Sequence, residues 1–239
     1  MILPFQALAR GWADLLRPRV LRLVVIGIAL TILLFVALQA GVFWLIRTFL
    51  PGGLTLPWVG AIDLGNTLSW GSLALFPLMG FFLMAPVAAG FAGLFSENVA
   101  DAVEEIHYPN RQGTSLSILD GLGESVALMV LVLVVAVVSL LLTPFLGPFA
   151  PVLFYGVNGW LLGREFFQMA ARRHLSKDSA ATMRSQYRGQ ILLSGILVAV
   201  ALTIPIVNIA VPLLAAASFT HLFHLISAKA GPDSRYLRG

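Results

Sequence analysis

The chain has 239 residues, of which 59% are hydrophobic and only 11% charged, and its mean hydropathy is +0.91. These values exclude an ordinary soluble domain, and the apolar runs are far longer than membrane β-strands, so we predict an all-α membrane protein with a single integral membrane domain over residues 1–239. The absence of cysteine excludes disulfides, thiolate metal sites and cysteine nucleophiles. The formal charge of +4 arises from few ionisable groups and indicates membrane topology, not nucleic-acid binding.

The segment from Pro4 to Leu16 predicts a short amphipathic helix that lies along the membrane interface. Its large apolar side chains share one helical face: Phe5, Leu8, Trp12, Leu15 and Leu16. Arg10 and Asp14 lie elsewhere on the helix, and Pro18 ends it. A signal peptide is the competing interpretation, but no small-residue cleavage pattern follows closely.

Two long helices are expected next. Val20 to Leu50 exceeds the ~20 residues that a bilayer requires and predicts the first spanning helix. Pro51 to Asn66 predicts a compact loop on the far side of the membrane. Thr67 to about His107 then predicts one long returning helix whose last turns project beyond the membrane.

The end of this second helix is acidic. Glu97, Asp101 and Glu104 follow one another at i, i+4 and i+7, which places them on one face. We expect this face either to pair with arginine, with Arg164 or Arg111 as candidates, in gating or assembly contacts, or to be a solvated helix end.

The stretch from Val126 to Gly163 has no charged residue and is broken by prolines between Thr143 and Pro151. Proline lacks an amide donor and clashes with the preceding turn, so one continuous helix is excluded. The arm that resumes at Val152 covers roughly 18 Å, against a hydrocarbon core of about 30 Å. We predict a helical hairpin that enters the bilayer and returns, with its turn held inside protein. An ordinary pair of spanning helices with a tight apolar turn is the alternative.

The same arrangement occurs a second time. Gln190 to Thr203 and Leu213 to Ser227 are short apolar arms, and the charge-free break from Ile204 to Pro212 contains Asn208. Such repetition is typical of channels and transporters. Each returning arm begins after a proline, so its free amide donors would face the membrane interior and favour an anion.

The basic residues predict the topology. Counting crossings places both termini and residues 108–124 and 164–188 on one side, which then holds all but Arg47 of the 15 Lys and Arg residues. The positive-inside rule makes this side cytoplasmic. Arg17, Arg19 and Arg22 cluster there at the mouth of the first spanning helix, where they serve either as snorkelling anchors or as anion contacts.

Patterns for catalysis or metal binding are weak. Glu104 and His107 form a single Glu-x-x-His, whereas a di-iron bundle needs a second such motif and two further glutamates. His221 and His224 could line a path or bind metal, but we expect hydrogen-bonded histidines near the interface. Neither His-Glu-x-x-His nor a P-loop occurs. We therefore expect no enzyme, no metal and no cofactor.

Four segments, taken in order, are similar to those of a known family: Leu16–Arg22 (LRPRVLR), Ala88–Glu97 (AAGFAGLFSE), Ala150–Leu162 and Ile204–Pro212. Through them nearly the whole chain resembles the CysZ family of bacterial inner-membrane sulfate permeases. The resemblance implies two long transmembrane helices, two partly membrane-penetrating helical hairpins and a homo-oligomer, expected to be a hexamer. It also implies passive sulfate uptake for cysteine synthesis.

The resemblance also implies where sulfate binds, at the Gly-x-Arg turn that opens the first long helix. Carried over by position, the site comprises Arg19, Val20, Leu21 and Arg22, where Arg19 stands at the glycine, Leu21 at the first arginine and Arg22 keeps the second. There sulfate would exchange water for guanidinium and backbone donors. Pathway or gating roles are expected for Glu97, Asp101, Arg164 and Asn208. The alternatives are a non-conducting membrane scaffold and a channel for another small oxyanion.

Overall fold

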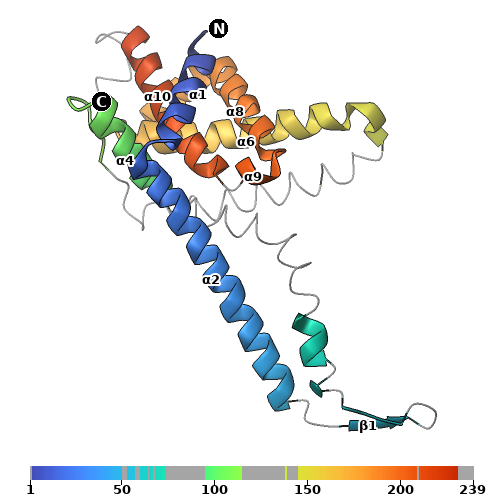
Figure 1. Cartoon of the computed structure of the whole chain (residues 1–239). Helices are drawn as coiled ribbons and strands as arrows, with labels where there is room; N and C mark the ends of the chain where they lie inside the picture. Colours follow the sequence, from blue (N-terminus) through green and yellow to red (C-terminus); the bar gives the residue numbers. More distant parts are fainter. Residues whose placement is uncertain are drawn as a thin grey trace.

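The computed structural model describes residues 2–49, 53–56, 60–63, 65–66, 68–73, 95–114, 138, 145–208 and 210–230. These residues are helical with the exception of loops and one two-stranded hairpin (Figure 1). The elements are α1 (Ile2–Leu15), α2 (Pro18–Phe49), β1 (Gly53–Leu56), β2 (Gly60–Asp63), α4 (Ser96–His107), the 3₁₀ turn η1 (Gly147–Phe149), α6 (Ala150–Arg172), α7 (Lys177–Gln186), α8 (Arg188–Leu202), α9 (Pro205–Asn208) and α10 (Val211–Ala230).

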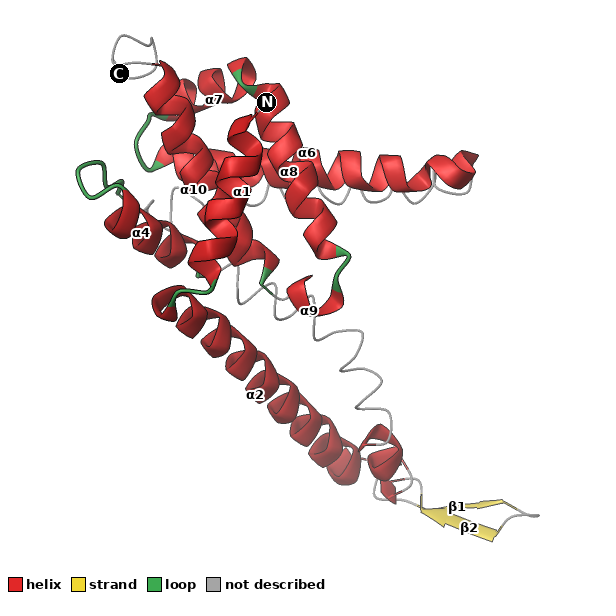
Figure 2. Cartoon of the chain, turned by 45° about the horizontal axis from the view of Figure 1, so that its top comes forward, coloured by secondary structure: helices red, strands yellow, loops and turns green. Residues whose placement is uncertain are grey.

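Helix α2 leaves the other helices as a single long rod (Figures 1 and 2). Its 32 residues span about 48 Å, more than the hydrocarbon core of a bilayer. Half of its large apolar side chains are exposed, among them Val25, Leu33 and Trp44. Among the described helices, α2 and α10 are long and apolar enough to cross a membrane, and α2 agrees closely with the predicted first span.

The prediction of a compact loop from Pro51 to Asn66 is incomplete, because this segment contains a β-hairpin. Its strands β1 and β2 pair antiparallel, with Gly53 opposite Asp63 and Leu56 opposite Gly60. After this hairpin, residues 68–73 are helical and lie against α2. There the Gln39 amide donates to the Ser72 hydroxyl (3.1 Å), and the Phe43 and Trp70 rings meet edge to face (5.9 Å).

The predicted single helix from Thr67 to His107 is not continuous. Helix α4 begins at Ser96, because its N-cap Phe95 has φ −93° and ψ 1°, outside regular helix geometry. Gly90 and Gly93 precede this break in the sequence, and glycine lowers helix propensity. Residues 74–94, the middle of the predicted helix, lie outside the described residues.

Helix α10 lies at the centre of the bundle, in contact with α1, α4, α6 and α8 (Figure 2). Leu214, Phe219 and Leu222 are fully buried there. The predicted short returning arm, Leu213–Ser227, is therefore the middle of a 20-residue helix.

Helix α1 packs on α10 through its small residues and Asp14, whereas Phe5 and Trp12 are exposed. A Cβ built on Gly11 would lie 2.2 Å from the Ser218 hydroxyl, so only glycine allows this approach. The predicted apolar face is therefore divided: Phe5, Trp12 and Leu16 are exposed, as an interfacial helix requires, whereas Leu15 is buried in the core and Leu8 packs against it.

Among the described helices, α6 and α8 make the most extensive contact. Gly159 and Gly163 on α6 face Gly195 on α8, and small residues at this spacing let two backbones approach in a membrane protein. Helix α6 continues to Arg172, so its 23 residues span about 34 Å and the predicted short arm is wrong in length.

The two predicted breaks are partly visible. In the first, Gly147 has φ +47°, a left-handed conformation that favours glycine, and Pro148 and Pro151 stand at the starts of η1 and α6. In the second, the one-turn helix α9 joins α8 to α10. The entering arm of the first hairpin, Val126–Leu142, lies outside the described residues except for residue 138.

Candidate functional site: a buried network of carboxylates, histidines and arginine

All four histidines of the chain meet where α1, α4, α10 and the end of α6 come together. His107 ends α4, His174 follows α6, and His221 and His224 are one turn apart on α10. Each of the four hydrogen-bonds a carboxylate. The network therefore joins segments far apart in the sequence, with Asp14 and His221 separated by 207 positions.

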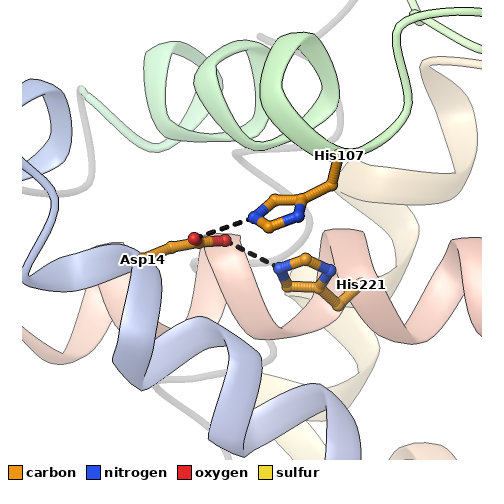
Figure 3. Close-up of side chains that lie close together, drawn as sticks. All are labelled: Asp14, His107 and His221. Carbon is orange, nitrogen blue, oxygen red and sulfur yellow. Dashed lines mark hydrogen bonds and ion pairs between the residues drawn. The ribbon is translucent and has the colours of Figure 1, made fainter.

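The first group centres on Asp14 of α1, whose side chain is 1% exposed (Figure 3). His107 Nε2 donates to its Oδ1 (2.9 Å) and His221 Nε2 donates to its Oδ2 (2.8 Å). Arg17 Nε contacts Oδ1 as well (2.6 Å). Burial alone raises the pKa of Asp14, but the hydrogen bonds from both histidines outweigh this effect and the pKa is lowered.

The second group centres on Glu104 of α4, which is equally buried. Its Oε1 accepts from Nε2 of His174 (2.7 Å) and of His224 (3.3 Å), while its Oε2 accepts from the backbone N–H of Gly113 (2.8 Å). These donors overcome desolvation and hold the pKa of Glu104 well below its usual range. Glu104 is therefore a fixed buried anion.

Arg173 balances the acidic face of α4. Its side chain is fully buried, and its guanidinium donates to Glu97, to Asp101 and to Oε2 of Glu104 (3.1 Å for the last). Desolvation alone would lower the pKa of Arg173, but the hydrogen bonds and charges of Asp101 and Glu104 outweigh it and raise that pKa further above its usual value. The predicted face thus exists and is paired, but neither predicted partner is the right one.

Tyr108 links the two groups. Its hydroxyl donates to Nδ1 of His221 (2.8 Å), and its ring stacks on that of His224 at 3.9 Å between centroids. The prediction of hydrogen-bonded histidines is correct in its chemistry, and the partners are Asp14, Glu104 and Tyr108.

The four residues at the predicted sulfate turn occupy the first turn of α2, but Val20 is buried in the core while Arg19, Leu21 and Arg22 are exposed. Arg19 pairs with Glu105 of α4 (2.5 Å). This turn is separate from the buried network, although α4 contacts both.

Arg164 lies elsewhere, with its guanidinium over the Trp160 ring (5.8 Å to the centroid). It lines a pocket with Arg184 and Arg188, and the predicted pairing with Glu97 and Asp101 is therefore wrong. Asn208 ends α9, where its backbone N–H donates to Ile204 (2.8 Å). The structure thus brings only Glu97 and Asp101 of the predicted pathway residues together.

A family model described as "Sulfate transporter CysZ/Etoposide-induced protein 2.4" matches residues 7–212, which is most of the chain. The chain belongs to this family. The resemblance to CysZ proteins found in the sequence is thereby confirmed, and the CysZ/etoposide-induced protein 2.4 family is of the transporter type. No curated protein matches the chain at a significant level.

The residues matched to the CysZ/etoposide-induced protein 2.4 family include Asp14, Glu104, His107, Arg173 and His174, but the match ends before His221 and His224. Sequence reasoning missed Asp14, Tyr108, Arg173 and His174 as members of one network.

Proposed function

We propose that this protein is a sulfate permease that mediates passive sulfate uptake across the bacterial inner membrane for cysteine synthesis. Membership of a family that includes sulfate transporters supports the substrate, and the exposed apolar length of α2 supports a spanning protein. A single membrane domain is part of the proposal, and the one-sided distribution of Lys and Arg supports placing both termini in the cytoplasm. Assembly as a homo-oligomer belongs to the same proposal.

The observation that carries the proposal is a pocket of about 380 Å³ with three arginines in its wall. Arg164 comes from α6, Arg184 from α7 and Arg188 from the start of α8. The remaining lining residues, all described, are Trp160, Ser185, Ile191 and Leu192, so no carboxylate lines it. Its volume is in the usual range for small-ligand sites of about 300–1,000 Å³.

The charge of this pocket favours an oxyanion. Burial, together with the charge of Arg164, lowers the pKa of Arg184, which means that like charges oppose one another there. A doubly charged oxyanion would remove that repulsion and accept paired N–H bonds from the planar guanidinium groups. Ser185 offers a hydroxyl donor at the same place.

The first turn of α2 remains the proposed second contact for sulfate. Arg22 is exposed there, and the first amides of a helix have no intrahelical acceptor. Arg19 is held by Glu105, so sulfate would have to compete with that pair. Asn208, in the break between α8 and α10, is kept as a proposed pathway residue.

The test is uptake of labelled sulfate into proteoliposomes. Wild-type protein should exceed empty vesicles, and Arg164→Gln and Arg184→Gln should each lower the rate several-fold. The matched control is Arg47→Gln, which removes the same charge at the far end of α2, where the guanidinium lies over Phe43 (5.5 Å). Its rate should stay near wild type.

Each outcome has a defined meaning. Absence of flux above empty vesicles refutes conduction and leaves a membrane scaffold. Flux of another oxyanion in preference to sulfate refutes the substrate but not the pocket. Equal flux for wild type and both pocket variants refutes the pocket, and an Arg22→Ala variant with unchanged sulfate flux refutes the α2 contact.

A further inference from the structure

We propose that Glu104, His174 and His224 form a binding site for a divalent transition metal ion of the zinc type. The donor set is two imidazole nitrogens and one carboxylate oxygen, which is the set found in many three-ligand zinc sites. This site is independent of the proposed sulfate pocket, because the two share no residue.

The three donor atoms already lie close to one another. Oε1 of Glu104 lies 2.7 Å from Nε2 of His174 and 3.3 Å from Nε2 of His224, and all three atoms lie within 4.8 Å of one another. Bonds of about 2.0–2.1 Å in tetrahedral geometry place neighbouring donors roughly 3.3 Å apart. The metal would enter by small side-chain movements, and each imidazole would carry its proton on Nδ1 instead of Nε2.

The surroundings hold the three side chains in place. Glu104 uses Oε2 for the Gly113 N–H and Arg173, which leaves Oε1 free to face the histidines. The His224 ring stacks on Tyr108 at 3.9 Å and the His174 ring stacks on Phe223 at 4.8 Å. Ligands fixed in this way by outer contacts are typical of metal sites.

The site also has one accessible side. The side chains of Glu104 and His224 are buried, whereas that of His174 is 15% exposed and stands in the loop after α6. A metal could therefore enter past His174, and water could fill a fourth coordination position there.

Net charge distinguishes this triad from its neighbour. Around Glu104 there are three carboxylates, of Glu97, Asp101 and Glu104, against the single guanidinium of Arg173. The positive charge of Arg111, which interacts electrostatically with His224, offsets one more negative charge and leaves the surroundings with a net charge of about −1. A surplus of negative charge favours a divalent cation.

The group of Asp14, His107 and His221 has the same donor types but the opposite balance. Its single carboxylate is paired with Arg17 (2.6 Å), and the positive charge of Arg10 interacts electrostatically with His221. A dication there would face two guanidinium groups with one carboxylate. We therefore assign the metal to the Glu104 triad alone, and the Asp14 triad provides an internal control.

The test uses the full chain, purified in detergent without a polyhistidine tag and stripped of metal. Co²⁺ added to it should give the visible absorption of a tetrahedral ion with one site per chain, and Zn²⁺ should displace it. No thiolate band should appear, because the chain has no cysteine. His174→Gln should weaken Co²⁺ binding at least tenfold, whereas His107→Gln, which removes an equivalent imidazole from the Asp14 triad, should leave the affinity unchanged.

His174 is chosen because its side chain is partly exposed and lies outside the helices, and the glutamine amide can still donate to Glu104; the metal-free melting temperature of the variant is measured beside its Co²⁺ affinity to show that the variant is folded. Absence of a tetrahedral Co²⁺ spectrum in the wild type would refute the site and leave a cluster joined by hydrogen bonds only. Loss of binding in His107→Gln but not in His174→Gln would place the ion at the Asp14 triad and refute the assignment. Sulfate flux plays no part in this readout, so the proposed function can fail separately.

Discussion

Replacement of Arg173 by glutamine tests whether the buried ion network holds α4 against the end of α6. The Arg173 guanidinium is fully buried and contacts Glu97, Asp101 and Glu104. Glutamine keeps some hydrogen-bonding capacity but removes the charge. The change leaves Glu104 as a buried carboxylate without its cation, although His174, His224 and Gly113 still donate to it.

The magnitude follows from burial. Removal of one partner of a buried ion pair costs about 3–5 kcal/mol, since the other charge stays uncompensated. Glu97 and Asp101 are 33% and 46% exposed, so solvent screens their share and Glu104 dominates. We therefore expect Arg173→Gln to lower the free energy of unfolding by about 3 kcal/mol. Arg19→Gln breaks a pair whose members are 56% and 55% exposed, and a loss of at most ~1 kcal/mol is expected there.

Unfolding in mixed micelles with increasing sodium dodecyl sulfate, followed by tryptophan fluorescence, measures both variants against wild type. The midpoint should shift strongly for Arg173→Gln and little for Arg19→Gln. Equal shifts would show that burial does not set the strength of these pairs, and an unchanged Arg173→Gln midpoint would show that the network does not stabilise the fold.

Two further predictions concern packing and pH. Gly195→Ala should destabilise the α6–α8 pair by about 1–3 kcal/mol, because its Cβ would lie 1.9 Å from the Gly159 carbonyl oxygen. The control is Gly189→Ala, which has open space around it and should leave stability unchanged. Equal unfolding midpoints for the two variants in the same assay would contradict the close approach. Since the pKa of Glu104 in the fold is lowered from 4.5, its contribution to stability is complete above pH 4.5 and is lost as the pH falls below it. The pKa of Glu97 is raised by burial, so its protonation stabilises the fold as the pH falls and partly masks the effect of Glu104. Wild type is therefore compared with Glu104→Gln, whose melting temperature should depend less on pH in that range. Identical pH profiles of the two proteins would refute the role of Glu104.

Local features of the fold could be predicted from the sequence. The apolar run that forms α2 and the prolines at the start of α6 and near the start of α10 act through neighbouring residues, so their positions follow from composition and backbone chemistry. The break at Phe95 and the extra length of α6 and α10 could not be predicted in this way. The extra length of α6 depends on its contacts with α8 and α10, which the periodicity of a single segment does not contain, whereas the break at Phe95 follows Gly90 and Gly93, whose low helix propensity the long apolar run concealed.

The partner of the acidic face shows the same limit. Arg164 and Arg173 are nine residues apart, which is two and a half helical turns, so the two side chains lie on opposite faces of α6. Only one of them could face α4, and the sequence does not say which. Arg173 reaches Glu97, Asp101 and Glu104, while Arg164 joins Arg184 in the pocket.

The sequence contains a pattern that predicts the histidine network, but only when two segments are compared with each other. Glu104 and His107 are three residues apart on α4, and His221 and His224 have the same spacing on α10. When two helices of equal spacing run in opposite directions, the first residue of one pair meets the second of the other. Glu104 indeed meets His224 at 3.3 Å, and the rings of His107 and His221 lie 5.0 Å apart. Matched i, i+3 pairs of polar residues on two apolar-flanked helices therefore predict contact between those helices and fix their register, which is more than either pair indicates alone.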